Sequence, residues 1–199
     1  MSRKALLIGI NHYRMPGVDL QGCVNDVTNI RDILLKYFGF AVEDIRVLAD
    51  GRATKKAIMQ RLEWLVKDAK AGDRLLLHFP GHGSQIRDRN GDELRDRLDE
   101  ILCPHDMDWD GTFIVDDELD AFFSKLPKGV RLEVLLDCCH SATGIREGTG
   151  LRCLPPEQTI KARFLQPPVT GIRTDIEEKK PSDKSDEVVS LKKNYYYLL

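Results

Sequence analysis

The sequence lacks the features that mark several classes of protein. No apolar run approaches the roughly 18 residues of a membrane-spanning helix, and MSRKALLIGI at the N-terminus has no long apolar segment followed by a small-residue cleavage site. The 5 cysteines include no CxxC pair, which argues against a disulfide scaffold. Lys plus Arg number 30 against 32 for Asp plus Glu, so there is no global basic field for nucleic acid. We expect a cytoplasmic protein with reduced thiols that binds neither membrane nor nucleic acid.

The composition is sufficient for one folded domain followed by a tail. The chain has 199 residues, of which 42% are hydrophobic, and this allows a substantial core. Paired prolines follow Leu154 and Gln166, and the stretch 177–187 mixes charges with serine and lysine. We therefore expect a folded domain over 1–154. A proline-containing linker and a reduced, partly flexible C-terminal segment should occupy 155–199.

Short apolar runs alternate with amphipathic stretches over the first 137 residues. Asn25 or Asp26 is a candidate N-cap for the first helix and Thr54 for the second. Strands alternating with helices predict a parallel sheet with right-handed crossovers, which is an α/β fold. The expected strands are 4–10, 45–48, 73–79 and 130–136, and the expected helices are 25–37, 54–69 and 116–123.

Two sequences that contain candidate catalytic residues follow the third and fourth expected strands. These are PGHGSQ, which contains His82, and DCCHSAT, which contains Cys138 and Cys139. Ligands of parallel sheets bind beyond the carboxyl ends of the strands, so both sequences should lie at one edge of the sheet. A neutral imidazole beside a thiol can take its proton and make it a nucleophile. Gly83 leaves a backbone N–H open to an oxyanion, and the cysteine N–H can supply a second donor.

Five motifs resemble those of metacaspases, which are caspase-like cysteine peptidases, in order and spacing over residues 4 to about 154. The resemblance is to the bacterial type without a prodomain. It implies a caspase-like three-layer sandwich in which helices flank a mostly parallel central sheet, with the catalytic domain over 1–154. The motifs are LQGCVND at 20–26, GHGSQ at 81–85, GDELRDRLDE at 91–100, FIVDDEL at 113–119 and DCCHSA at 137–142.

The resemblance assigns roles to the residues at the sheet edge. His82 is the expected general base, Cys139 the expected nucleophile, and the N–H groups of Gly83 and Cys139 the expected oxyanion hole. Cys138 stands where the family usually has serine and is the rival nucleophile; otherwise it is a small core residue. His140 is expected to be a structural hydrogen-bonding residue.

The resemblance also implies cleavage of polypeptides after exposed Arg or Lys by a monomeric enzyme. A basic side chain needs carboxylates at its binding site, and two acceptors suit a guanidinium. Asp26 and Asp137 occupy the family's substrate-binding positions, with Cys23 beside them. Pro80 replaces a usual serine there. Self-cleavage is expected in the stretch after the nucleophile, at Arg146, Arg152, Lys161 or Arg163.

Acidic residues gather between Ile86 and Asp120, where 13 acidic and 4 basic residues give a local charge of −9. The resemblance implies a regulatory Ca²⁺ site at Asp99, Asp116 and Asp117, and hard oxygen ligands suit this ion. Arg146 falls on the family's fourth ligand position, so we expect weak binding. A solvated loop is the alternative. The DxDxDG run at 106–111 resembles the start of an EF-hand loop, but no helix is expected before it.

Two further readings belong to other functional classes. The C-terminal part is shorter than the family's, which favours a catalytically silent caspase-like module that binds partners. A zinc site is a third reading, although adjacent cysteines rarely share one tetrahedral metal. Its ligands would come from Cys103, His105, Cys138, Cys139 and His140.

Overall fold

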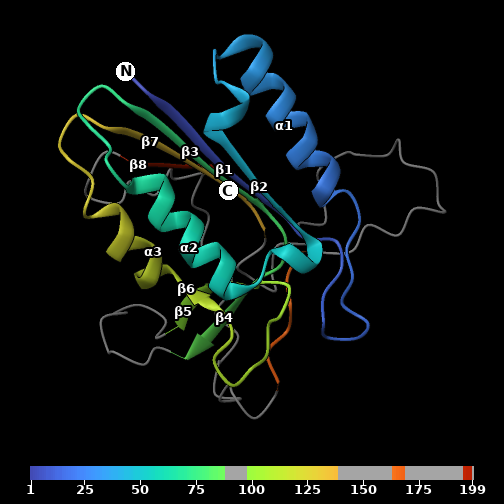
Figure 1. Ribbon diagram of the computed structural model, residues 1–199. Coiled ribbons are helices and arrows are strands. Elements are labelled where there is room, and N and C mark those ends of the chain that lie inside the picture. The colour runs from blue at the N-terminus through green and yellow to red at the C-terminus, as the bar shows by residue number, and fades with distance from the viewer. Residues whose placement is uncertain (88–97, 139–162, 169–194, 199) are drawn as a thin grey trace, which may run out of the picture.

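The computed structural model describes residues 1–87, 98–138, 163–168 and 195–198. Its central sheet has the strand order β2-β1-β3-β7-β8, and every one of these neighbouring pairs is parallel (Figure 1). The order places β3 and β7 side by side, as the positions of the two expected site motifs require. The strands are β1 (Arg3–Gly9), β2 (Ile45–Ala49), β3 (Arg74–Pro80), β7 (Arg131–Asp137) and β8 (Tyr195–Leu198).

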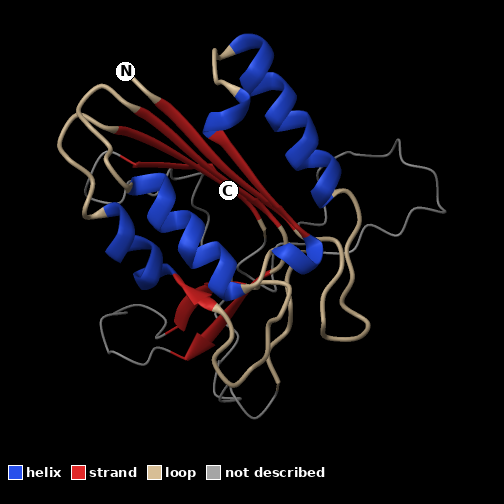
Figure 2. Cartoon of the chain, in the orientation of Figure 1, coloured by secondary structure: helices blue, strands red, loops and turns tan. Residues whose placement is uncertain are grey.

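Helices cover both faces of this sheet. The helix α1 (Cys23–Tyr37) lies on one face, while α2 (Lys55–Val66) and α3 (Asp116–Phe123) lie on the other (Figures 1 and 2). Short 3-10 helices, η1 (Val42–Asp44) and η2 (Asp50–Arg52), flank β2. The three-layer sandwich with a parallel central sheet is therefore confirmed. The predicted boundary at residue 154 lies outside the described residues.

The sheet separates two apolar cores because alternate residues of each strand point to opposite faces. Leu6, Ile8 and Phe79 belong to the core under α2 and α3, whereas Leu7 and Leu76 belong to the core under α1. The contact between β1 and α1 is very close at Gly9. A Cβ there would lie 2.7 Å from the carbonyl oxygen of Cys23 and 2.8 Å from Val27 Cγ2. Glycine thus lets the start of α1 sit directly on the end of β1.

A second, smaller sheet occupies the acidic stretch, where the sequence predicts no strand. It consists of the antiparallel strands β4 (Gly83–Arg87), β5 (Leu98–Leu102) and β6 (Ile114–Val115). Ile101 and Ile114 are fully buried, and Leu102 beside them is buried as well. The high density of charge in this stretch conceals its short apolar runs, so none of the three strands was predicted from the sequence.

The first helix begins earlier than either predicted cap. Gly22 is the N-cap of α1, with a φ of 91°, and neither Asn25 nor Asp26 caps it. Asp26 lies instead in the first turn, where its carboxylate is available for another partner. The prediction for the second helix is confirmed, since Thr54 Oγ1 accepts a hydrogen bond from Ala57 N at 3.2 Å.

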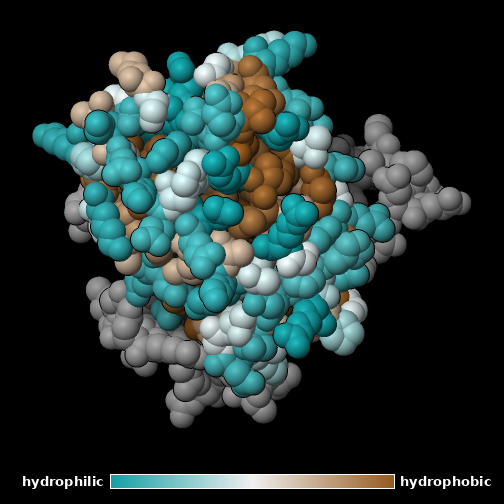
Figure 3. All heavy atoms as spheres, in the orientation of Figure 1, coloured by the Kyte–Doolittle hydropathy of each residue, from teal (hydrophilic) through white to brown (hydrophobic). Residues whose placement is uncertain are grey.

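Large apolar side chains are exposed beside the edge strand β2. Ile33, Tyr37 and Phe38 from the end of α1, with Val42 and Val47, are the exposed ones in this region. Figure 3 shows brown atoms gathered over α1 and β2. Among the described residues, no helix combines the length and the apolar character needed to cross a membrane.

Candidate active site

The two expected site motifs meet at the carboxyl ends of neighbouring strands. Pro80, the last residue of β3, is paired with Asp137, the last residue of β7. Gly81 N donates a hydrogen bond to the carbonyl oxygen of Asp137 at 3.4 Å. His82 and Cys138 therefore follow adjacent strands, as predicted. Cys139 and His140 lie outside the described residues.

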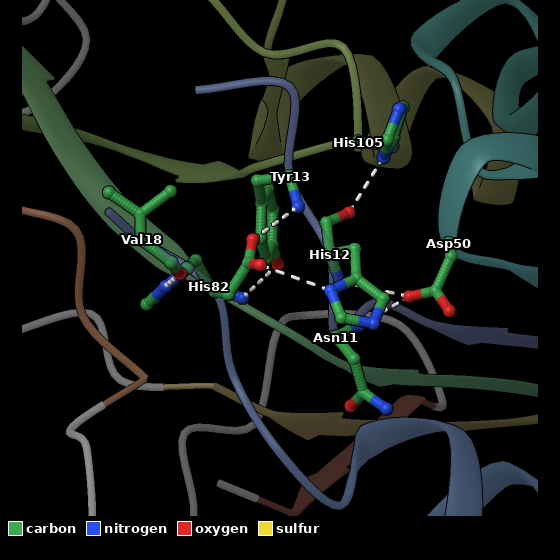
Figure 4. A network of polar contacts seen from close by, with 8 residues as sticks. Asn11, His12, Tyr13, Val18, Asp50, His82 and His105 are labelled. Atoms are coloured by element: carbon green, nitrogen blue, oxygen red, sulfur yellow. Dashed lines mark hydrogen bonds and ion pairs between the residues drawn. The ribbon is translucent and has the colours of Figure 1, made fainter. Parts of the chain in front are cut away.

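His82 is buried and held from two sides by the loop that follows β1. Its backbone N–H donates to Tyr13 Oη at 2.8 Å, and its Nε2 lies 2.7 Å from the carbonyl oxygen of Val18 (Figure 4). A carbonyl oxygen only accepts hydrogen bonds, so Nε2 carries a proton. The basic nitrogen of the neutral ring is then Nδ1. The rings of Tyr13 and His82 pack with centroids 5.0 Å apart.

The loop that carries Tyr13 and Val18 is itself fixed by polar contacts. Asp50 Oδ1 accepts hydrogen bonds from the backbone N–H groups of Asn11 and His12 at 2.7 and 2.9 Å. His105 Nδ1 lies 2.6 Å from the carbonyl oxygen of His12 (Figure 4). Tyr13 and Val18 were not among the expected site residues. The available signal was their place after β1, because the carboxyl end of that strand lies at the same sheet edge.

Close packing explains why the residue before His82, Gly81, is a glycine. A Cβ on Gly81 would lie 2.9 Å from Phe79 Cε1 and 3.1 Å from Tyr13 Oη. A side chain at this position would therefore push against the residue that positions His82.

Cys138 has the surroundings of a core residue. It is 9% exposed and belongs to the apolar core under α2 and α3. This agrees with its expected structural role. Cys103, on the same core, is fully buried, and burial strongly raises the pKa of its thiol.

Asp26 and Asp137, which we call the acidic pair, are brought together around an arginine of the same chain. Arg163 Nη2 donates to Asp26 Oδ2 at 2.7 Å, and Arg163 Nη1 donates to Asp137 Oδ2 and to the carbonyl oxygen of Asp137, the latter at 3.2 Å. Only 20% of the Arg163 side chain is exposed. Sequence patterns predicted Arg163 as a cleavage position and missed this pairing.

The charges of the acidic pair act on two buried neighbours. Burial raises the pKa of the Cys23 thiol to about 11. The positive charge of Arg163 opposes this rise, and the negative charges of Asp26 and Asp137 add to it. Burial lowers the pKa of His78 on β3; Asp137 and Asp26 raise it and Arg163 lowers it further. His78 Nδ1 is buried and makes no hydrogen bond with the described residues. Cys23 is thus a neutral thiol beside the acidic pair, as its expected position suggested.

The segment 163–168 continues from Arg163 along the start of β4. Gly83 N donates to the carbonyl oxygen of Arg163 at 2.9 Å, and Leu165 N donates to the carbonyl oxygen of Gly83 at 3.0 Å. Ser84 Oγ donates to the carbonyl oxygen of Leu165 at 2.5 Å, and Leu165 is 7% exposed. The N–H expected to bind an oxyanion therefore binds a peptide carbonyl. The other expected cleavage residues, Arg146, Arg152 and Lys161, lie outside the described residues.

The three expected calcium ligands come from two elements. Asp99 is buried on β5, and Asp116 and Asp117 begin α3. Burial, followed by the negative charges of Asp117, Glu100 and Asp99, raises the pKa of Asp116 to about 7. Within the described part of the chain, no group of three or more His, Cys, Asp or Glu side chains is arranged to hold a metal ion. The three carboxylates lie close enough to affect one another electrostatically, but in the described residues they are not gathered into one set of ligands.

The DxDxDG run forms a turn that binds its own loop. Asp108 Oδ1 accepts hydrogen bonds from the N–H groups of Asp110 and Thr112 at 3.0 and 2.9 Å. Asp106 Oδ1 accepts from Lys55 N at 2.8 Å. These carboxylates bind backbone N–H groups of the chain itself, which disfavours the EF-hand alternative.

Comparison with known proteins identifies the family. The family model "Metacaspase, peptidase C14 domain" matches residues 3–146. The chain is 44% identical over 150 residues to metacaspase-1 of Ajellomyces capsulatus and 45% identical over 150 residues to metacaspase-1A of Aspergillus niger. Each match covers 72% of this chain but only 41% and 36% of the two relatives.

A solved structure supports the fold. The crystal structure of a Geobacter sulfurreducens protein is 31% identical in sequence and superposes with a TM-score of 0.60, over 72% of this chain and 52% of that one. The match to the family model covers well over half of the 199 residues. The chain therefore belongs to the metacaspase family of C14 peptidases.

Proposed function

We propose that this protein is a cysteine endopeptidase that cleaves polypeptides after Arg or Lys, with Cys139 as nucleophile and His82 as general base. The observation that carries the specificity is the acidic pair. Asp26 and Asp137, from α1 and β7, converge on one guanidinium at the sheet edge that holds His82. Bidentate or paired carboxylates recognise arginine with geometric selectivity, and they attract lysine by charge.

The surroundings of His82 support its role as a base. The carbonyl oxygen of Val18 accepts the hydrogen bond of Nε2, so Nδ1 is the basic nitrogen of the neutral ring and the atom that would take the proton of a thiol. The resulting thiolate attacks the carbonyl carbon of the substrate residue. The negative charge on the oxygen is then stabilised by the Gly83 N–H, and the imidazolium protonates the leaving amine. Water hydrolyses the thioester in the second half of the reaction.

Hydrolysis of fluorogenic peptides ending in Arg, Lys or Asp tests this proposal. We expect cleavage of the Arg and Lys peptides and none of the Asp peptide. Cys139→Ala should abolish it, His82→Ala should lower kcat by about 10²-fold or more, and Cys138→Ser should retain a substantial part. If Cys139→Ala were active and Cys138→Ser inactive, the nucleophile would be Cys138.

The acidic pair has its own control. Asp26→Ala or Asp137→Ala should weaken cleavage after Arg much more than alkylation of the nucleophile by iodoacetamide. Equal loss of both reactions would indicate damage to the dyad or to the fold, and would contradict a role in specificity.

The same assay separates an enzyme from a silent module. The chain spans about two fifths of the length of the metacaspases described above. A protein that binds an arginine peptide through Asp26 and Asp137 but never hydrolyses it would be a binding module of the same fold.

We also propose that Ca²⁺ stimulates the protein, acting weakly through Asp99, Asp116 and Asp117. The support is the repulsion of Asp116 by Asp117, Glu100 and Asp99, which adds to the effect of burial in raising the pKa of Asp116 to about 7. A divalent cation would relieve this repulsion. The test is activity against Ca²⁺ concentration and in EDTA. Stimulation that persists undiminished in Asp116→Ala with Asp117→Ala would rule out this site. We further propose a cytoplasmic monomer, for which sedimentation of the purified chain is the check on oligomeric state.

A further inference from the structure

Arg163 and the two residues after it contact the proposed site in the way a bound peptide would. Its guanidinium lies in the acidic pair, and its carbonyl oxygen accepts from the N–H of Gly83. We infer that residues 163–165 are an internal ligand of the substrate site, which external Arg or Lys side chains must displace. This inference rests on the proposed function, because it takes the acidic pair to be the site for basic residues.

An ordinary structural ion pair would account for only part of these contacts. The contacts of the Arg163 guanidinium with Asp26 on α1 and Asp137 on β7 would by themselves be a structural link between these two elements. The backbone of the segment is bound as well, since Leu165 N donates to the carbonyl oxygen of Gly83 and Ser84 Oγ donates to that of Leu165. Contacts thus lie on both sides of the peptide bond between Arg163 and Phe164. The residue that supplies the expected oxyanion donor also anchors the chain beyond that bond.

Burial shows that the segment is held firmly. The Arg163 side chain is 20% exposed, and Leu165 is 7% exposed and belongs to the core under α2 and α3. Burial alone would lower the pKa of Arg163, but the hydrogen bonds that it donates to Asp26 and Asp137, and the negative charge of Asp137, raise it overall. The arginine therefore stays cationic in place and competes with any external cation for the same two carboxylates.

Tethering strengthens this competition. A ligand on the same chain faces its site at an effective concentration of about millimolar. The apparent Kd of an external ligand rises in inverse proportion to the fraction of molecules whose site is free. A segment bound in about nine tenths of the molecules would weaken external binding about tenfold. We expect at least this difference between the parent protein and a variant without Arg163.

Calorimetric titration with benzamidine, a small guanidinium-like cation, tests the inference. The full chain carries Cys139→Ala, so that no cleavage disturbs binding, and benzamide serves as the neutral control ligand. We expect Arg163→Ala to bind benzamidine at least tenfold more tightly than this parent. Arg163→Lys should stay close to the parent. Arg131→Ala, which removes an exposed arginine paired with Glu133, should leave the affinity unchanged.

A second variant covers the case in which Arg163→Ala does not fold. Leu165→Ala leaves the acidic pair and its arginine intact but removes an anchor of the segment, so benzamidine should bind more tightly than to the parent, by less than with Arg163→Ala. Equal affinity in the parent, Arg163→Ala and Leu165→Ala would overturn the inference and leave the proposed function standing. If Arg163→Ala folds but binds no benzamidine, the acidic pair is not a site for basic groups, and the proposed function fails with it.

Discussion

Tyr13 supports His82 through a single buried hydrogen bond. Its Oη accepts from the backbone N–H of His82 at 2.8 Å, and burial keeps the phenol neutral by raising its pKa well above the ordinary value. Tyr13→Phe would leave a buried N–H without this acceptor. We expect the free energy of unfolding to fall by about 1–2 kcal/mol, measured by urea denaturation. Tyr37→Phe, at a residue that is 68% exposed, is the matched control and should change little.

The pKa of the buried His78 reports the charges at the acidic pair. Burial and the charge of Arg163 lower its pKa, while Asp137 and Asp26 raise it. Arg163→Gln removes one of the lowering effects and leaves both carboxylates in place. The pKa of His78 should therefore rise relative to wild type, as followed by NMR titration of its ring. An unchanged titration would mean that Arg163 does not occupy the acidic pair in solution.

At the scale of elements, α3 and β5 share a pH-dependent repulsion. The pKa of Asp116 is about 7 in the folded chain against an ordinary value of 3.8. The folded state thus holds this proton more tightly than the unfolded state. The free energy of unfolding must then decrease as pH rises between about 4 and 7. The decrease should be about 1 kcal/mol or less, because Asp116, although partly desolvated by its neighbours, is still more than a third exposed, and solvent screens its charge.

Thermal unfolding checks this contribution and the calcium proposal together. Asp116→Asn should flatten the decline of Tm between pH 5 and pH 8. Millimolar Ca²⁺ should raise the wild-type Tm more at pH 8, where Asp116 is ionised, than at pH 5. Asp32→Asn, on the exposed side of α1, is the control and should behave as wild type. Equal stabilisation by Ca²⁺ in Asp116→Asn would contradict the assignment.

The segment at 163–165 also selects one bond among the expected self-cleavage positions. The carbonyl oxygen of Arg163 accepts the hydrogen bond of the Gly83 N–H, the expected oxyanion donor, so we expect the bond between Arg163 and Phe164 to be the one cleaved. Mass spectrometry of the active protein should detect fragments 1–163 and 164–199. Arg163→Ala should abolish these fragments, and Arg152→Ala should keep them. Fragments ending only at Arg146, Arg152 or Lys161 would contradict this choice.

At the scale of the molecule, the two fragments should remain together after such a cut. The C-terminal fragment contains β8, which pairs with β7 from Leu132 to Leu135, and it also contains the buried Leu165. Gel filtration of the cleaved protein should give one peak, while a denaturing gel shows two bands. Two separate peaks would show that β8 and Leu165 do not hold the halves together.

Much of the architecture was predictable because it is encoded locally. Apolar runs that end in turn residues gave four strands of the central sheet, and the rule for strand ends brought His82 and Cys138 to adjacent strands. The small sheet was missed because its buried residues, Ile101 and Ile114, stand in short apolar runs within a stretch rich in acidic residues. The pairing of Arg163 with Asp26 joins residues 137 positions apart, and no local pattern encodes such a contact.

The short distance in sequence between Asp137 and Arg163 has a consequence for the order of events during synthesis of the chain. Asp26, Gly83 and Asp137 all precede Arg163 in the chain, and Arg163 follows Asp137 by 26 residues. A ribosome adds about 5–20 residues per second. The interval between the synthesis of the second carboxylate and that of its arginine is therefore about 1–5 seconds. A newly made molecule has almost no period in which its acidic pair exists before its own arginine does.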